Sequence, residues 1–497
     1  MADSCIAVLD VGKSNKKVVV YDDQLRPLEA VSKTFDVQFD QGVLCEPVEE
    51  TAAWFFASLK ALSTEHVIKA VSVSSHGAAF ACLDEKGALA LPVLSYIYDP
   101  GEKFHHQFHE RFGSPDELHK KMATPFMPGL GCIAKGVYYL QEKHSEAFCR
   151  TETILNLPQY YGFLLTGQKG TEYTYLGTHT YLWDFDRWNY SVMVDQLGIR
   201  AKLPRTVSKP WDVLGTVTPD AARQTGLSED TIVTLGIHDS NASLLPYLIK
   251  TAEPFALNST GTVMVAMRPA EQVHVTDDML GKAIYYNASA FSQPVRTSLF
   301  LGGLEFDTYL GEFQRVHGQQ EFPGFDRDLC ERILKERAHF ILPSLIPFGI
   351  FPQSRARIVD GQQTYSLGDV TGSNQPPFID DYGHACTVLT LSLAIQSKLA
   401  LEQTGLQEGD TVFVEGGFHK NDCYTTFLSN LLPNSRVACS SLDEATAFGT
   451  ALLAKAALEG KRPDEMGAYF ELETRTVEKC GLGHLAEYCE TFLRHVA

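Results

Sequence analysis

The feature that most constrains the fold is a β-hairpin with a turn of small polar residues, which occurs once in each half of the chain. The first hairpin spans residues 5–23, with the apolar run CIAVLDVG, the turn KSNK and the strand-like run KVVVYDD. The second hairpin spans residues 254–269 and repeats strand, Ser/Thr/Gly turn and strand in PFALNSTGTVMVAMRP. This recurrence predicts two α/β domains that face each other across a cleft.

The chain has 497 residues, more than one hydrophobic core usually supports, so two or more domains are expected. The boundary falls most naturally near LPYLIKTAEP, which divides the chain into residues 1–248 and 249–497. The region from about residue 100 to residue 210 has a mixed pattern of helices and loops. We expect it to be an elaboration on the first domain.

Other patterns predict elements around these hairpins. Strands are expected at 69–77 (KAVSVSSHG) and 88–99 (ALALPVLSYIYD), and an apolar helix is expected at 50–62. A strand, a glycine turn and a helix follow at 410–433. The run SLDEATAFGTALLAKAALEG predicts a further helix. Ser441 or Asp443 can cap its start, and Glu444 lies near the positive end of the helix dipole.

Charge and cysteine content exclude several classes of function. The net charge of −19 and the lack of a Lys/Arg-rich run argue against a nucleic-acid or anionic-membrane surface. The eleven cysteines are scattered without a CxxC pair, which suits reduced thiols in a cytoplasm better than a disulfide framework. The start MADSCIAVLDVG lacks the pattern of a signal peptide, and no apolar run reaches the roughly 20 residues that cross a bilayer. We therefore expect a cytoplasmic enzyme or binding protein.

The first turn, Asp10 to Lys17, can be a simple hairpin turn or a phosphate loop. In a phosphate loop, Gly12 lets backbone N–H groups approach an anion, while Ser14 and Lys17 supply a hydroxyl and a positive charge. A Walker A loop is excluded, because GxxxxGK[ST] is absent and a strand follows the turn. Asp10, at the end of the first strand, would bind Mg²⁺ through water, since hard cations prefer oxygen ligands.

Two turns in the second half offer a similar choice. Residues Asn258 to Thr262 are either an ordinary hairpin turn or a second phosphate cradle. The pair Gly416–Gly417, followed by Asn421, is either tight packing between a strand and a helix or a wall without side chains for an adenine ring. Two phosphate-type hairpins in opposite halves, followed by a glycine wall, together favour a nucleotide-binding site.

One acid, Asp239, follows a buried-looking strand and precedes small, hydroxyl-rich residues in TLGIHDSNASLLPYL. Its carboxylate can cap a helix that begins at Ala242, or it can act as a catalytic base. The two roles are compatible, because a capping carboxylate can still face the cleft.

The histidines have structural and functional interpretations. His76, before Gly77 at a strand end, is either packed in the fold or a hydrogen-bond donor to a sugar hydroxyl, and His238 beside Asp239 is expected to be structural. His105 and His109 have the i, i+4 spacing of a metal-binding pair. No Cys or Asp cluster supports a metal there, so we expect a solvated helix face.

The motifs, in this order, resemble those of the FGGY carbohydrate kinases, within the hexokinase, Hsp70 and actin superfamily. The resemblance covers nearly the whole chain, and its strongest segments are DVGKSNKK, GIHDSNAS, NSTGTV, VEGGFHKNDCYTTFLSNLL and EATAFGTALLA. HGAAFACLDEKG and HDSNAS are similar to segments of the L-rhamnulose and L-fuculose kinase branch. The implied fold is α/β, with two ribonuclease-H-like domains, the first holding most of the sugar and the second most of the nucleotide.

The resemblance implies roles for the matched positions. Asp239 corresponds to the catalytic base that takes the proton of a primary hydroxyl as it attacks the γ-phosphate of ATP, and Asp10 corresponds to the acid linked to Mg²⁺. The implied ATP-binding positions are Gly12, Lys13, Ser14, Lys17, Thr260, Gly261, Thr262, Gly416, Gly417 and Asn421. The implied sugar-pocket positions are His76, Gly77, Asp99 and His238.

The chain departs from the family pattern at three places. Lys13 stands where relatives usually carry Thr, Ser or Ala, so its ammonium group either touches the transferring phosphate or points to solvent. YIYDPGE lacks the arginine that often follows the pocket acid, and LPSLIPFGIFPQS lacks a Gly-Glu-Arg element. These departures leave the ATP machinery intact and the identity of the sugar open.

The sequence therefore predicts an ATP-dependent kinase of a small ketose, such as the 6-deoxyketohexoses L-rhamnulose and L-fuculose, phosphorylated at O1. The alternatives are a kinase of a pentulose or tetritol and a non-catalytic, nucleotide-dependent binding module. A small sugar is the expected partner, whereas nucleic acid and membrane are not. The oligomeric state stays open, with a homodimer as one option.

Overall fold

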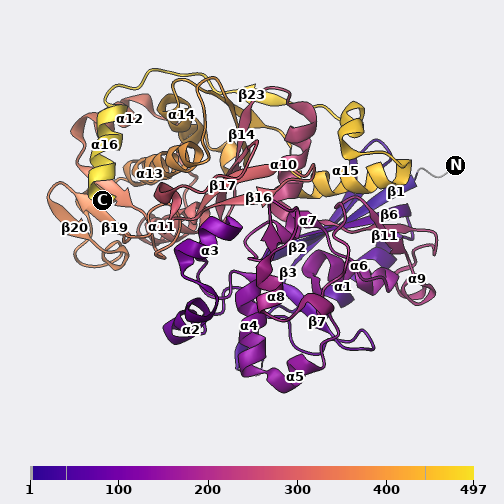
Figure 1. The fold of residues 1–497 in the computed structure, drawn as a ribbon. Coiled ribbons are helices and arrows are strands. Elements are labelled where there is room, and N and C mark those ends of the chain that lie inside the picture. Colours follow the sequence, from indigo (N-terminus) through magenta and orange to yellow (C-terminus); the bar gives the residue numbers. More distant parts are fainter. Residues whose placement is uncertain (1–3, 41, 443, 497) are drawn as a thin grey trace.

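The computed structural model describes residues 4–40, 42–442 and 444–496. It contains two large mixed sheets, one in each half of the chain, and helices cover both (Figure 1). Of the two cap residues expected for the helix near residue 445, Asp443 lies outside the described residues.

The first sheet has the strand order β3-β2-β1-β6-β12-β11, and β13 also pairs with β6. β1 runs antiparallel to β2 and parallel to β6, and β12 and β13 run parallel to β6. β1 and β6 are apolar and almost continuously buried, as expected for strands covered on both faces. The strands are β1 (Ser4–Val11), β2 (Asn15–Tyr21), β3 (Pro27–Thr34), β6 (Val67–Ser75), β11 (Val213–Thr216), β12 (Ile232–Thr234) and β13 (Ile237–His238).

The second sheet repeats this arrangement. Its central order, β17-β15-β14-β21-β22, is again an antiparallel trio followed by two parallel strands. The repeat confirms the predicted α/β fold with two ribonuclease-H-like halves. The strands are β14 (Phe255–Thr260), β15 (Met264–Pro269), β16 (Ile284–Ala288), β17 (Pro294–Phe300), β21 (Thr411–Gly416), β22 (Arg436–Ser440) and β23 (Thr474–Thr476).

Two of the three elements predicted between the first hairpin and residue 100 are confirmed. α1 (Val48–Leu62) and β6 correspond to the predicted helix at 50–62 and strand at 69–77. The strand predicted at 88–99 is wrong, because this segment makes only the isolated bridges Leu83–Leu89 and Cys45–Leu94. Pro92 lacks the N–H group that a continuous ladder needs, and it interrupts the pairing.

Residues between 100 and 210 form a helical elaboration on the first sheet, as predicted (Figure 1). Its apolar core, which includes Phe108, Tyr138 and Trp183, is separate from the core that lies between the first sheet and α1. Its helices and strands are α2 (Glu102–Phe112), α3 (Pro115–Met122), α4 (Ile133–Lys143), α5 (Ser145–Cys149), β8 (Thr153–Asn156), α6 (Leu157–Thr166), α7 (Tyr173–Leu176), β9 (Trp183–Asp184), β10 (Asn189–Tyr190) and α8 (Val192–Gln196).

The remaining elements complete the layers around the two sheets. In the first half these are β4 (Gln38–Asp40), β5 (Val43–Cys45), β7 (Phe80–Leu83), α9 (Pro219–Thr225) and α10 (Asp239–Lys250). In the second half they are α11 (Gly302–His317), α12 (Arg327–Glu336), β18 (His339–Leu342), β19 (Arg357–Asp360), β20 (Gln363–Tyr365), α13 (Tyr382–Gln403), α14 (Asp422–Leu431), α15 (Ala445–Glu459) and α16 (Leu485–Val496).

α15 belongs to the second half of the sequence but packs on the first sheet. Figure 1 shows it beside β1 and β6, and Phe448 and Leu452 of α15 share a core with Ile6 and Val8 of β1. α15 also crosses α10 closely at Gly449, where a Cβ atom would lie 1.9 Å from the Ala242 carbonyl oxygen. α10 and α15 therefore join the two halves. The division at residues 248 and 249 stays a prediction.

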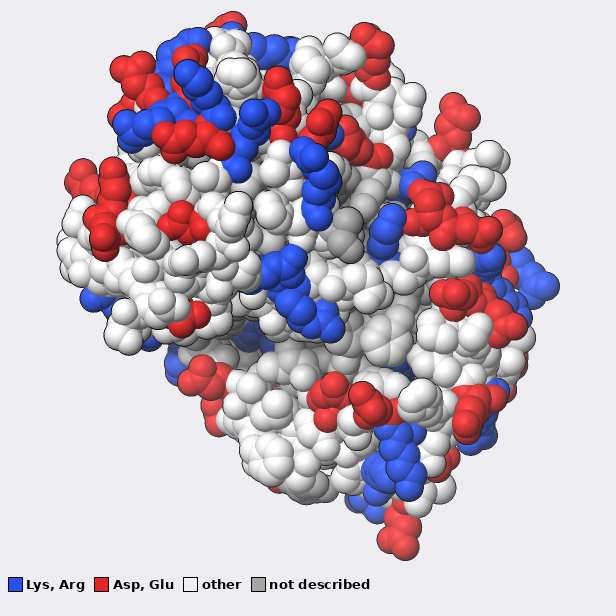
Figure 2. Space-filling view, turned by 90° about the vertical axis from the view of Figure 1, so that its left-hand side faces the viewer, with Lys and Arg blue, Asp and Glu red and all other residues white. Residues whose placement is uncertain are grey.

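α13 is the helix at the centre of the second core. Among the described helices, it is the one long and apolar enough to span a membrane by length and composition, and 89% of its most apolar window is buried inside the protein. Its apolar residues pack against β15, β17 and β18, so the helix serves as core structure. On the face shown in Figure 2, acidic and basic side chains are interspersed.

Candidate active site

Three segments of the chain meet where β1, β6 and β13 end at one edge of the first sheet. Asp10 lies opposite Ser74 in the β1–β6 register, and His238 lies opposite Ser75 in the β13–β6 register. The Ser74 hydroxyl donates to Asp10 Oδ1 at 3.0 Å. Crevices outside the carboxyl ends of parallel strands are the usual ligand sites of such sheets. The fold therefore brings Asp10, the segment after β6 and the start of α10 to one candidate site.

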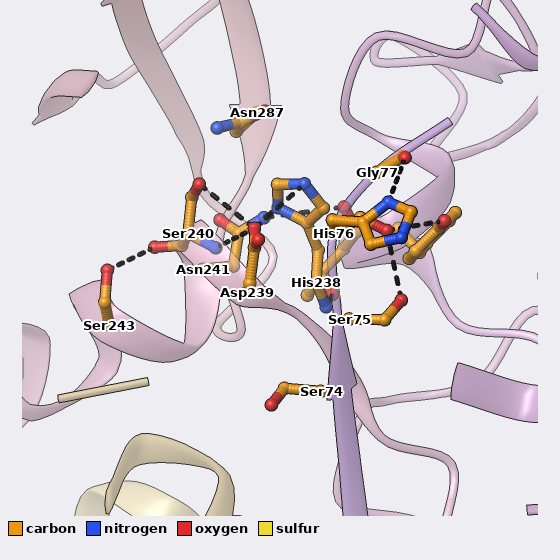
Figure 3. A network of polar contacts seen from close by, with 12 residues as sticks. Ser74, Ser75, His76, Gly77, His238, Asp239, Ser240, Asn241, Ser243 and Asn287 are labelled. Carbon is orange, nitrogen blue, oxygen red and sulfur yellow. Dashed lines mark hydrogen bonds and ion pairs between the residues drawn. The ribbon is translucent and has the colours of Figure 1, made fainter. Parts of the chain in front are cut away.

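Asp239 is the first residue of α10, and its carboxylate is partly open. The helix predicted to begin at Ala242 begins earlier, at Asp239, because the small polar residues that follow are accommodated in the first turn. Asp239 Oδ1 accepts the N–H group of Ser240 at 2.5 Å and the Ser240 hydroxyl at 3.2 Å (Figure 3). The side chain is 31% exposed. Burial raises the pKa of Asp239, while the neighbouring His76 opposes the rise.

His238 lies beside the Asp239 carboxylate. Its Nε2 is 3.3 Å from Asp239 Oδ1. Burial lowers the pKa of His238 to about 3, so the ring is neutral at pH 7. These contacts all use Oδ1, which leaves Oδ2, within the described part of the chain, as the oxygen available to a substrate.

Gly77 allows two histidine rings to pack closely against its backbone. A Cβ atom at Gly77 would lie 2.8 Å from His179 Nε2 and 3.0 Å from His238 Nε2. His179 donates its Nδ1–H group to the Gly131 carbonyl at 2.9 Å, so its Nε2 is an acceptor, and burial lowers its pKa to about 4. His76 donates Nδ1–H to the Gly77 carbonyl at 3.0 Å, and burial lowers its pKa. Neutral ring nitrogens that accept hydrogen bonds suit the hydroxyl groups of a sugar.

The short helix α7 holds these histidines in place. The Thr174 hydroxyl accepts the His238 backbone N–H at 3.2 Å, and the Tyr175 hydroxyl donates to the His76 carbonyl at 2.8 Å. Glu172 caps α7 by accepting the N–H groups of Thr174 and Tyr175. Glu172 is buried, and burial raises its pKa to about 7.

The side chain of Lys13 turns into the first half of the protein. It forms an ion pair with Glu46, donates to Ser95 Oγ at 2.7 Å and lies over the Tyr96 ring, 4.7 Å from the centroid. The contact of Lys13 with a phosphate stays a prediction, and the alternative that its ammonium group points to solvent is wrong. The physical reason is Glu46, since a buried carboxylate is stable as an anion only beside a compensating charge.

A cavity of about 590 Å³ lies between Asp10 and the second sheet. Burial raises the pKa of Asp10 to about 7, although the hydrogen bond from Ser74 opposes the rise. Lys17 forms an ion pair with Glu444, a residue of the cavity wall. Among the described residues, the lining comprises Asp10, Ser259, Glu415, Gly416, Gly417, His419, Lys420, Leu442, Glu444, Ala445 and Thr446.

The cavity suits a nucleotide with a divalent cation. Keeping buried Asp10 ionised costs free energy, and a bound cation would relieve this cost. The carboxylate oxygens of Asp10 suit Mg²⁺ as ligands. Gly416 and Gly417 contribute a wall without side chains, and the volume is within the usual range of cofactor sites.

The first phosphate turn combines a conformational glycine with exposed polar residues. A Cβ atom at Gly12 would lie 2.7 Å from the Asn15 carbonyl oxygen, so the turn requires glycine. Ser14 is exposed at its tip. The binding roles of Gly12, Ser14 and Lys17 stay predictions.

In the second turn, Thr260 links β14 to the glycine pair. Its hydroxyl donates to the Glu415 carbonyl and accepts the Phe418 N–H at 3.1 Å. Gly416 has a φ angle of +77°, and a Cβ atom there would lie 2.1 Å from the Thr260 carbonyl, so only glycine fits. Gly261 and Thr262 are exposed at the hairpin tip.

Asn421 and Asp99 have capping contacts. Asn421 caps α14 by accepting the Tyr424 N–H at 2.9 Å. Asp99 is 61% exposed, accepts the Gly101 N–H at 2.8 Å and lies 2.9 Å from His105 Nε2. Their roles in ligand binding stay predictions.

The solvated helix face expected for the histidine pair in α2 is wrong. His105 and His109 are both partly buried, and their rings pack 5.5 Å and 5.8 Å from the ring of Phe126. The aromatic residues of the helical elaboration cover this side of α2.

Sequence reasoning gave no functional role to four residues that the fold brings to the site. Glu46 and His179 lie in segments without a recognisable motif, and Glu415 and Glu444 were noticed only as neighbours of the glycine pair and of a helix start. A polar residue between apolar runs is the only local signal that Glu46 offers, and many surface acids share it.

Comparisons with known proteins agree with this arrangement. Residues 5–246 match the N-terminal domain of the FGGY family of carbohydrate kinases, and residues 252–463 match the carbohydrate kinase FGGY C-terminal domain. The structure is similar to that of a carbohydrate kinase from Novosphingobium aromaticivorans, with 26% identity and a TM-score of 0.80 over 100% of this chain and 99% of that one. The fold also matches ligand-bound xylulose kinase from Lactobacillus acidophilus, with 16% identity and a TM-score of 0.81 over 99% of this chain and 97% of that one.

Curated relatives match over parts of their length. The chain is 26% identical to L-fuculokinase from Salmonella typhi over 55% of this chain and 58% of that protein. It is 25% identical to rhamnulokinase from Halalkalibacterium halodurans over 30% of this chain and 31% of that protein. In both cases the match spans less than two thirds of the relative.

Proposed function

Because the chain belongs to the FGGY family of carbohydrate kinases, we propose that it transfers the γ-phosphoryl group of ATP to a primary hydroxyl of a small sugar. The proposed acceptor is a 6-deoxyketohexose of the L-rhamnulose or L-fuculose type, phosphorylated at O1. The partial similarity to L-fuculokinase and rhamnulokinase supports this choice of sugar. In this proposal residues 1–248 supply most of the sugar site, and residues 249–497 supply most of the nucleotide site.

The observation that carries the proposal is the environment of Asp239. One carboxylate oxygen accepts two hydrogen bonds from Ser240 and lies beside His238, while the other has no hydrogen bond within the described residues and can receive a proton. A primary alcohol is a poor nucleophile at neutral pH, and an aligned proton acceptor speeds such reactions by about 10²–10⁴-fold. The capping role that the sequence left open for Asp239 is wrong, because His238 is the N-cap residue of α10 and no side chain caps this helix.

The other residues of the chain position the reactants. His76 was expected to donate a hydrogen bond to a sugar hydroxyl, but its Nδ1–H group is used on the Gly77 carbonyl, so in this proposal the neutral Nε2 atoms of His76 and His179 accept hydrogen bonds from the sugar. Backbone N–H groups of the turns at Gly12 and Gly261 hold the phosphates. Asp10 holds Mg²⁺, which offsets charge on the phosphates when bound.

The first test is the substitution Asp239→Asn, which retains the size of the side chain and removes its basicity. The rate of ATP-dependent sugar phosphorylation should fall by about 10²–10⁴-fold, with the melting temperature and ATP affinity close to those of the wild type. Asp230→Asn, which neutralises an exposed acid in the same half of the chain, is the matched control. A folded Asp239→Asn protein that phosphorylates sugar at a near-normal rate would refute the assignment of the base.

A panel of acceptors assayed by ADP release identifies the sugar. L-Rhamnulose and L-fuculose should give the highest kcat/KM, with pentuloses and tetritols lower. Turnover of a pentulose alone would move the proposal to another acceptor, and ATP binding without turnover of any sugar would favour a non-catalytic module.

We propose a reducing compartment, the cytoplasm, as the place of this reaction. All eleven cysteines of the chain are described by the structure, and none of them forms a disulfide. Most of them are buried in the cores, where thiols are retained in cytoplasmic proteins.

A further inference from the structure

Lys13 leaves the phosphate turn and turns into the first half of the protein. Its ammonium group contacts the Glu46 carboxylate and the Ser95 hydroxyl, and only 22% of its side chain is exposed. The turn itself holds this direction, because Lys16 Nζ donates to the Lys13 carbonyl at 2.7 Å. A cation in this position does not lie among the residues that line the nucleotide cavity.

Glu46 is the residue that requires this partner. Its side chain is 3% exposed and enters the protein between β5 and α1, where the Glu46 N–H donates to the Val93 carbonyl at 2.8 Å. Burial alone would raise the pKa of Glu46, but His76 and Lys13 outweigh this effect and hold the pKa below its usual value. The Glu46 carboxylate is therefore an anion that interacts both with Lys13 and with His76.

Tyr96 links this ion pair to the segment that contains His76. The Lys13 ammonium lies 4.7 Å from the centroid of the Tyr96 ring, and the centroid of the His76 ring lies 5.5 Å from that of Tyr96. The next residue, Gly77, packs against the rings of His179 and His238, and His238 Nε2 lies 3.3 Å from Asp239 Oδ1. A series of contacts thus runs from Lys13 through Tyr96 and the His76–Gly77 segment to His238, which lies beside Asp239.

We infer that Lys13, although it stands in the phosphate turn, is a positioning residue for the sugar: with Glu46 and Ser95 it fixes the Tyr96 and His76 rings that form one wall of the acceptor pocket. This inference rests on the proposed kinase function. It assigns to one turn two separate duties, because Lys17 of the same turn faces the nucleotide cavity through Glu444.

The two lysines make a matched pair for the experiment. Lys13→Met removes the charge beside Glu46 and retains most of the apolar length, and Lys17→Met does the same beside Glu444. Leaving a buried charge unpaired disturbs its surroundings strongly, so Lys13→Met should weaken sugar affinity by about tenfold or more. The same variant should leave ATP affinity within about twofold of the wild type, and Lys17→Met should show the reverse pattern.

Affinities are measured by calorimetry, with the best acceptor of the panel and with a non-hydrolysable ATP analogue, separately. KM values for sugar and for ATP provide a second readout. Lys13→Arg, which retains the charge, should restore sugar affinity to within about threefold of the wild type. A merely structural lysine would change both affinities together, or neither.

Glu46→Gln supplies a further check if Lys13→Met does not fold. With the carboxylate neutralised, Lys13→Met should add little to the loss of sugar affinity, because the partner that it stabilises is already gone. A rise in KM for ATP with unchanged sugar affinity in Lys13→Met would overturn the inference. Failure of the wild-type protein to phosphorylate any acceptor would instead refute the proposed function, which separates the two.

Discussion

Lys17 and Glu444 form an ion pair across 427 positions of sequence, beside the cavity that contains Asp10. Glu444 is 48% exposed, and an ion pair of this exposure contributes little to stability. Instead, the ion pair changes the electrostatic potential at the place where the phosphates of a nucleotide would bind. Glu444 neutralises the charge of Lys17, the lysine of the turn that contacts the cavity wall. Its carboxylate also lies close enough to Asp10 to raise the pKa of that residue.

Glu444→Gln should therefore tighten the binding of nucleotide. The substitution frees Lys17 and removes a like charge from the path of the phosphates, so the Kd for ATP should fall by about two- to fivefold. Titration of the protein with ATP at constant Mg²⁺ and ionic strength measures the change. The control is Glu229→Gln, at an exposed acid outside the cavity, which should leave Kd unchanged. Weaker binding by Glu444→Gln would show that the carboxylate assists the nucleotide instead.

At the scale of elements, the crossing of α10 and α15 fixes the position of Asp239, the proposed base. Asp239 begins α10, and the carbonyl of Ala242 in its first turn lies directly against Gly449 of α15. The absence of a side chain at Gly449 allows the backbones of the two helices to approach closely. The position of Asp239 thus depends on a contact with a helix that follows it by some 200 residues in the sequence.

Gly449→Ala should disturb both stability and catalysis. The new Cβ would lie 1.9 Å from a backbone oxygen that cannot rotate away, so α15 must shift, at a cost of about 1–3 kcal/mol of unfolding free energy. Because α10 moves with it, kcat should also fall. Urea denaturation and steady-state kinetics measure the two effects.

The control for this substitution is Gly311→Ala. Gly311 also lies inside a helix, α11, and a Cβ atom there meets no atom within 4 Å. The alanine should stabilise the protein slightly, because alanine favours helix. Equal stability changes at Gly449 and Gly311 would contradict the role given to the close crossing.

The elements that could be predicted are those with a local signal. The hairpin β1–β2, the helix α1 and the acids Asp10 and Asp239 follow from periodicity, turn residues and motifs within a few positions. The contacts that organise the site join distant segments: Lys13 meets Glu46 across 33 positions, and His179 packs against Gly77. No local pattern specifies such partners, because they depend on how the sheets and the elaboration pack together.

At the scale of the whole molecule, buried ionisable groups give stability a dependence on pH. Burial raises the pKa of Glu172 and of Glu415 from 4.5 to about 7, so the folded state holds protons that the unfolded chain releases. The free energy of unfolding therefore falls as pH rises between these values. His179 and His238 act oppositely, with pKa values lowered from 6.5 to about 4 and about 3, and their stabilisation is complete once pH exceeds 6.5.

Above pH 6.5 the effect of these two histidines is complete, and the carboxyl groups should lower the stability of the protein between pH 6.5 and about pH 8, against a smaller opposing effect of Lys135, whose pKa burial lowers to about 8. Glu172→Gln should lose about 1 kcal/mol less than the wild type across this interval, since the amide does not titrate. Urea denaturation at the two pH values measures the difference. Glu229→Gln should retain the wild-type slope, and an identical slope in Glu172→Gln would mean that Glu172 is already ionised at pH 6.5.

The return of α15 to the first sheet has a consequence for any attempt to take the protein apart. A fragment severed at residue 248 would leave Ile6 and Val8 without the apolar cover that Phe448 and Leu452 now provide. The remaining fragment would expose an apolar face of the first sheet and would tend to aggregate. A split reporter or a domain graft built on this scaffold therefore has to carry residues 445–459 along with the amino-terminal half.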